Sequence, residues 1–188
     1  MLNRLIDNWV YGGFLAGLLL IALSPFIIFH WPVVFSAAFF CLPAYMLHQY
    51  EEHDKDRFRA FVNRLLGNGR EVLTRRAVFL INVPGVWGGI AVAIWLAARV
   101  NPGLALIDVY LLLLNGVIHV LQAIVARSYN PGLVTAIVLF LPVGCWGLIA
   151  VERSGAGTPA MHAIGVAAAV AIHLAIVVPV LRNRRKYA

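Results

Sequence analysis

Long runs of apolar residues alternate with short polar segments along the whole chain. Each run has about the ~20 residues that a helix needs to cross the ~30 Å hydrocarbon core of a bilayer. The six runs extend over residues 10–29, 32–52, 78–98, 103–126, 132–150 and 159–181. The pattern predicts an all-α, polytopic membrane helix bundle of about six transmembrane helices, forming a single transmembrane domain over residues 1–188.

Composition agrees with a membrane protein and argues against a soluble one. Hydrophobic residues make up 62% of the chain and charged residues 12%, whereas soluble domains are about half apolar and a quarter charged. The formal net charge of +7 would suit a nucleic-acid-binding protein if the chain were soluble. Because the basic residues lie between apolar runs, we expect membrane lipid as the partner and no nucleic acid.

Arginine and lysine residues are concentrated at one set of helix ends. The opposite ends carry Arg99 and Arg153. Positive residues remain on the cytoplasmic side of a membrane, so the N and C termini are both predicted to be cytoplasmic, and the membrane is the inner membrane if the source is bacterial. The residues of the basic set are Arg4, Lys55, Arg57, Arg59, Arg64, Arg70, Arg75, Arg76, Arg127, Arg182, Arg184, Arg185 and Lys186.

The basic loop, residues 54–76, contains an amphipathic pattern. Phe58, Phe61, Val62, Leu65 and Leu66 recur at helical spacing, with arginines between them. This pattern predicts a short interfacial helix on the cytoplasmic leaflet. An amphipathic helix packed on the bundle would show the same pattern.

Three histidines lie at a common depth in the second, fourth and sixth apolar runs. His48, His119 and His173 precede the basic residues of their own helix ends by nearly equal intervals. At ~1.5 Å per residue, all three imidazoles lie roughly 12 Å from the basic level. A single buried histidine is usually a packed, hydrogen-bonded residue, but the shared depth of three predicts one polar site.

Two carboxylates follow His48 on the same helix. Glu51 and Glu52 stand at i+3 and i+4, so both can share a face with His48. Near the interface such residues can also be an ordinary solvated helix end. Imidazoles with carboxylates suit divalent metals such as zinc or iron, so we predict metal ligands among His48, Glu51, Glu52, His119 and His173.

Further polar residues fall in or near the same layer. Asn82 reaches it from the opposite direction, and Asn115 lies one turn before His119. We predict that Asn82, Asn115, Gln122 and Tyr129 contact substrate or support the ligands.

The stretch from His48 to Glu52, HQYEE, resembles the membrane-protein family named for its HXXEE motif. The stretch from Asn115 to His119 and the later Tyr129-Asn130-Pro131-Gly132 are also similar to that family. The resemblance extends over most of the chain, through the fifth apolar run. It implies that His48, Glu51 and Glu52 form the site, and it supplies no reaction because the family's function is not established.

The site residues fit more than one function. The first hypothesis is a metal-dependent membrane enzyme that uses zinc or iron on a lipid-like or apolar substrate at the cytoplasmic leaflet, with the carboxylate that is not a ligand, Glu51 or Glu52, as catalytic base. A metal-independent enzyme could use the same carboxylates and histidines for acid–base catalysis. Intramembrane ionisable residues also occur in ion, proton or metal transporters, although the outer halves of the runs lack a matching polar route. A purely structural role would leave the histidine layer unexplained.

Overall fold

The computed structural model describes residues 1–186, and within them every regular element is helical. Six helical segments in this range are long and apolar enough to cross a membrane, which confirms the predicted multi-pass fold. The first is α1 (Leu2–Ile27) and the second α2 (Val33–His53). The third combines α4 (Arg75–Leu80), η2 (Ile81–Trp87) and α5 (Gly88–Arg99). The short η3 (Pro102–Ala105) leads into the fourth, α6 (Leu106–Ala126). The fifth combines α7 (Leu133–Thr135), η4 (Ala136–Phe140) and α8 (Leu141–Arg153), and the sixth is α9 (Pro159–Arg185).

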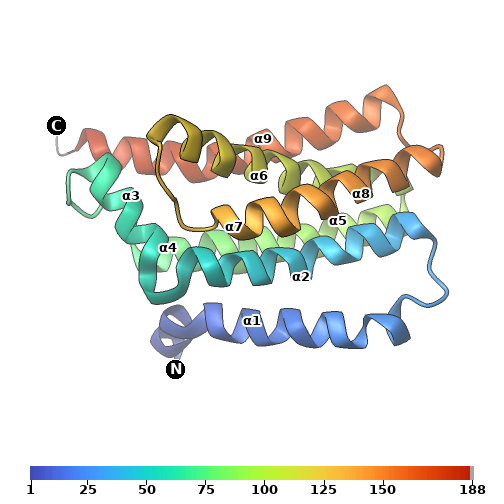
Figure 1. The fold of residues 1–188 in the computed structure, drawn as a ribbon, viewed down its shortest axis with the longest axis horizontal. Coiled ribbons are helices and arrows are strands. Elements are labelled where there is room, and N and C mark those ends of the chain that lie inside the picture. Colours follow the sequence, from blue (N-terminus) through green and yellow to red (C-terminus); the bar gives the residue numbers. More distant parts are fainter. Residues whose placement is uncertain (187–188) are drawn as a thin grey trace.

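Helix α2 is the centre of the bundle. In its most apolar window 67% of the residues are buried, a larger share than in any other span. It lies against α1, α5, α6 and α8, while α9 packs on α6. Figure 1 shows α1 and α9 on opposite outer sides of this arrangement. A site on α2 is therefore surrounded by protein.

The N-terminus and the C-terminal end of α9 lie at the end of the bundle that also carries the basic loop (Figure 1). The loop forms η1 (Asp54–Asp56) and α3 (Arg57–Gly67). In α3, Phe58, Val62 and Leu66 pack against a core cluster formed by the loop after α3, by α4 and by α9, whereas Leu65 is exposed. The helix thus rests on the bundle through one face. Its contact with the membrane surface stays a prediction, as does the cytoplasmic position of this end.

Two spans contain π-helical segments, η2 and η4. In η2 the cause is visible in the sequence, because Pro84 lacks an N–H group and cannot continue α-helical hydrogen bonding. Such segments widen the helix by one residue and often occur at functional sites. Both lie alongside the polar layer of α2, where Asn82 of η2 meets Gln49 and Phe140 of η4 packs on His48.

Candidate metal centre

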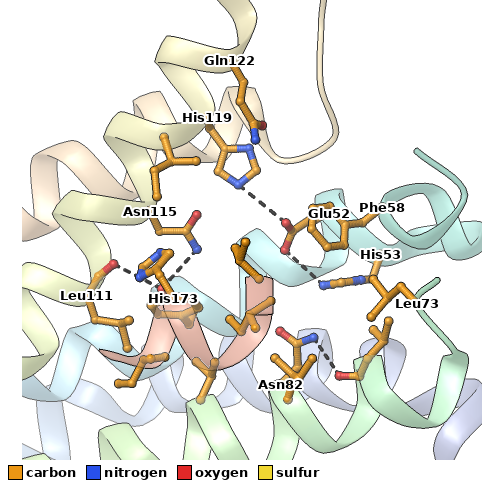
Figure 2. Close-up of a pocket in the computed structure, with 18 residues that line it drawn as sticks. Glu52, His53, Phe58, Leu73, Asn82, Leu111, Asn115, His119, Gln122 and His173 are labelled. Carbon is orange, nitrogen blue, oxygen red and sulfur yellow. Dashed lines mark hydrogen bonds and ion pairs between the residues drawn. The ribbon is translucent and has the colours of Figure 1, made fainter. Parts of the chain in front are cut away.

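Three side chains at the basic end of the bundle point toward one another. His48 and Glu52 stand one turn apart on α2, and His119 faces them from α6. The three ligand atoms lie within 4.8 Å of one another, so the group could hold a metal ion. Each His Nε2 atom is 3.6 Å from an oxygen of Glu52. Ligands bound at ~2.0–2.2 Å in a tetrahedron stand about 3.3–3.6 Å apart, which agrees with these separations. Figure 2 shows Glu52 and His119 facing each other across the site.

Hydrogen bonds decide which nitrogen of His48 carries its proton. Thr135 donates its hydroxyl to Glu51 Oε2 at 2.5 Å. That hydroxyl oxygen can then only accept from His48 Nδ1, which lies 2.9 Å away. His48 is therefore protonated on Nδ1, and Nε2 presents a lone pair. This Nε2 atom is buried and has no hydrogen-bond partner.

The same logic applies to His119. Asn130 donates its amide N–H to the backbone carbonyl of His119 at 2.9 Å, so its amide oxygen is free to accept. His119 Nδ1 lies 2.6 Å from that oxygen and must be the donor. The lone pair of His119 Nε2 is thereby directed at Glu52.

The Nε2 lone pairs of both imidazoles consequently face the carboxylate of Glu52. Neither imidazole has an N–H group on that side that could donate to the carboxylate. All three residues are buried. Electron-rich groups crowded in an apolar interior repel one another unless a cation lies between them. Histidine ligands whose other nitrogen donates to a fixed oxygen are the usual arrangement around protein-bound metals. The donor set therefore fits a divalent cation.

The loop between α6 and α7 closes over the two histidines. It begins where Arg127 takes a left-handed conformation, and it ends at Gly132, whose φ is +97°. A Cβ atom on Gly132 would lie 2.7 Å from Cε1 of His48 and 2.8 Å from Cε1 of His119. Only glycine permits both the backbone angle and this close approach. The backbone of the loop thus packs directly against both imidazole rings.

Glu51 lies beside the group and has a different role from the predicted one. Its carboxylate accepts the N–H groups of Val134 and Thr135 at 3.1 and 2.7 Å, at the start of the fifth span. The hydroxyls of Thr135 and Tyr129 also donate to it. A carboxylate at a helix N-terminus accepts hydrogen bonds from the free N–H groups there, and its negative charge interacts favourably with the helix dipole. Glu51 therefore anchors the helix that carries Thr135. Among the described residues, its hydrogen bonds go to Tyr129, Val134 and Thr135 and not to the three-residue group.

Tyr129 completes this anchor. Its hydroxyl lies 2.8 Å from Glu51 Oε1, although half of its side chain is exposed. Burial and then the hydrogen bond to Glu51 raise the pKa of Tyr129. The phenol remains protonated under physiological conditions and keeps donating. Tyr129 thus supports a residue that in turn supports His48.

His53 holds the other side of Glu52. Its Nε2 atom lies 3.1 Å from Glu52 Oε2, and its ring contacts Trp9 and Phe58. His53 was not among the predicted site residues, although its position immediately after Glu52 was an available signal. The prediction also left out Asn130, Gly132 and Thr135, of which Asn130 and Gly132 belong to the Tyr-Asn-Pro-Gly stretch described above.

A cavity of about 180 Å³ opens beside the centre, with Glu52 and His119 in its wall. The predicted residues Asn82, Asn115, Gln122 and His173 also line it. Figure 2 shows Asn115, Gln122 and His173 around the same space. His173 lies outside the three-residue group. Its Nδ1 donates to the carbonyl of Ala169 at 2.8 Å, and the residue stands in the cavity wall rather than at the predicted ligand position.

The four amide and tyrosine residues that were predicted to contact substrate or support the ligands divide into two sets. Asn115 and Gln122 face the cavity, with Asn115 also donating to Tyr45. Asn82 is tied by Gln49 and by the carbonyl of Val78, so it serves mainly the packing of α2 on η2. Tyr129 lies at the anchor of Glu51.

Comparisons with known proteins agree with the resemblance seen in the sequence. A search of curated proteins and a search of solved structures each found no match. A family model described as "Protein of unknown function with HXXEE motif" matches residues 39–147. The matched region contains His48, Glu51 and Glu52 together with His119, Asn130, Gly132 and Thr135. Since it covers more than half of the chain, the protein belongs to the HXXEE family.

Proposed function

We propose that this protein is a membrane-embedded, metal-dependent enzyme that acts on a lipid-like or apolar substrate at the cytoplasmic leaflet. The observation that carries the proposal is the arrangement of two imidazole lone pairs and one carboxylate around one buried point. Hydrogen bonds to Thr135 and Asn130 fix both imidazoles in the form that binds metal.

A catalytic role is favoured over a structural one by the number of ligands. Structural zinc sites are closed by four protein ligands, whereas catalytic sites use three and keep a position open. Here the described residues supply His48, Glu52 and His119, and the group borders a cavity. Two histidines and one carboxylate form the donor set of both zinc hydrolases and non-haem iron oxygenases. Zinc would activate water for hydrolysis, and iron would activate dioxygen.

The surrounding residues have separate tasks in this proposal. Glu52 neutralises the cation and is itself positioned by His53. Asn115 and Gln122 offer amide groups to a substrate in the cavity. His173 is the general base, because donation from Nδ1 to Ala169 leaves Nε2 as a proton acceptor on the cavity side. Glu51 accepts four hydrogen bonds on its carboxylate and so holds the start of the fifth span, with Thr135, against α2.

Elemental analysis of the full chain tests the proposal. The protein is purified in detergent without chelators, after growth with zinc and iron supplied. We expect a stoichiometric content of one of these metals in the parent and its loss in the double variant H48A/H119A. The matched control is His30→Ala, which removes an exposed histidine at the opposite end of the bundle. A metal-free parent, or equal metal in the double variant, would overturn the proposal and leave metal-independent acid–base catalysis in the same pocket.

A further inference from the structure

The wall of the cavity beside the centre combines polar and apolar side chains. Its polar residues include Glu52, His119, Asn115, Gln122 and His173. Its apolar residues come from several elements and include Ile172, Ile176 and Val177 of α9. A ligand that satisfies both kinds of side chain must be amphiphilic, with a hydrogen-bonding group next to the centre and hydrocarbon against the apolar residues of α9.

The charge of the wall sets the charge of the ligand. Among the described residues that line the cavity, none is lysine or arginine. The carboxylate of Glu52 is already faced by His48, His53 and His119. Apart from a metal ion at the centre itself, an anionic headgroup would therefore find no cation in the wall, and a cationic one would find no free carboxylate. Amides and an imidazole suit an uncharged group such as an alcohol, ester or amide.

The size of the cavity limits how much of a lipid it can enclose. Its volume is about 180 Å³, and an apolar cavity of about 150 Å³ holds a molecule of the size of benzene. Only the polar group and the first part of one chain can enter, so the rest must leave the bundle.

The route out is marked by residues that are exposed and also line the cavity. Val177 on α9 is 45% exposed, and Gln122 on α6 is exposed as well. Each stands the same interval before an arginine, Arg182 and Arg127 respectively, so the opening is close to the basic end of the spans. In a helix that spans a membrane, such an opening faces lipid.

We propose that this cavity binds an uncharged, single-chain lipid. Its polar group lies among Asn115, Gln122 and His173, and its chain leaves the bundle past Val177 into the bilayer. The inference rests on the proposed function for what happens to the lipid, but the binding itself is independent of any reaction.

Photolabelling of the purified full chain tests this binding. The probes are a long-chain alcohol with a diazirine in its chain and the carboxylic acid of the same length and diazirine position. We expect saturable labelling of cavity residues by the alcohol, and weaker labelling by the acid at neutral pH once a chelator has removed any metal that the carboxylate could bind. Val177→Trp should lower labelling by the alcohol about tenfold, the loss expected when roughly two methylenes are no longer buried. Gln122→Leu should lower it as well, while leaving labelling by the matching alkane unchanged.

The matched control is Val92→Trp, an exposed apolar position on α5 that does not line the cavity. It should label as the parent does. Stronger labelling by the acid, or unchanged labelling in V177W and Q122L, would overturn the inference. Metal content is measured on the same samples. Saturable labelling by the alcohol in a protein without metal would refute the proposed metal-dependent enzyme but support the lipid site. Metal in a protein that the alcohol does not label would refute the lipid site but support the metal centre.

Discussion

The Nδ1 atom of His48 lies 2.9 Å from the hydroxyl oxygen of Thr135, 87 residues further along the chain. The hydroxyl of Thr135 in turn donates a hydrogen bond to Glu51, which stands one turn from His48 on α2. The contact links two spans and at the same time fixes the imidazole in one tautomer. Packing of the fifth span and the chemistry of the centre therefore depend on the same hydroxyl group.

Thr135→Val preserves the shape of this side chain and removes the hydroxyl. We expect metal affinity to fall about 10–100-fold, as is usual when a group that orients a ligand is lost. Competition with a chelator of known affinity measures the change. Thr158→Val is the control, because it removes a hydroxyl that caps α9 at the opposite end. Equal affinity in T135V and the parent would show that the hydroxyl does not orient His48.

The two neighbouring glutamates should respond differently to the same substitution. Glu52→Gln removes the anionic ligand and should abolish stoichiometric metal binding. Glu51→Gln replaces an anchor that accepts hydrogen bonds with one that also donates, so it should weaken metal binding without abolishing it. Metal per chain, measured side by side after gel filtration, distinguishes them. A larger loss in E51Q than in E52Q would reverse the assignment made from the geometry.

His119 and His173 offer a matched pair on two adjacent helices. His119→Ala should empty the centre, since one of three ligands is lost. His173→Ala should retain the metal and lower turnover about 10²–10⁴-fold, the range typical of a lost general base. Labelling by the matching alkane, which needs no hydrogen bond from His173, reports whether the cavity remains intact in H173A. Loss of metal in that variant would make His173 a ligand after all.

Gly132→Ala tests the close approach of the loop. The new methyl group would overlap both imidazoles, and alanine is strained at a φ of +97°. We expect a loss of about 1–3 kcal/mol in the free energy of unfolding, from overpacking and backbone strain together. Reversible unfolding in a mixed detergent series measures it. Gly12→Ala is the control, since a Cβ there meets nothing within 4 Å.

The orientation of the bundle is open to a direct measurement. Reporter fusions after Leu66 and after Lys186 should both give a cytoplasmic signal, and one near Gly155 should give an outer signal. The concentration of arginines at one end of the bundle is the reason for this expectation. An outer signal from the basic loop would invert the layout and move the cavity opening to the other leaflet.

The spans were predictable from the sequence because their length and apolar content are nearly independent of what they pack against. Depth in the membrane was predictable too, since it follows from counting residues along a helix. That count placed His48 and His119 in one layer, and the structure brings both to Glu52. The count could not predict how each helix is rotated about its own axis. His173 was therefore expected in the group, but it lies outside it.

The choice between Glu51 and Glu52 was also beyond the sequence. Adjacent residues point about 100° apart on a helix, so at most one can face the centre directly. Which one does so depends on where the fifth span begins, and that is set by the loop that ends at Gly132. Thr135 was missed for the same reason, because threonine in an apolar run carries no sign of its partner across the bundle.

The long separation between His48 and Thr135 has a consequence for how the centre is made during synthesis. A nascent chain that has been translated as far as Ala126 already contains His48, Glu52 and His119. It still lacks Asn130 and Thr135, the residues that accept from the Nδ1 atoms, so neither imidazole is yet held in the tautomer with a free Nε2. Metal loading should therefore wait until the fifth span has inserted and Gly132 has closed over the two rings.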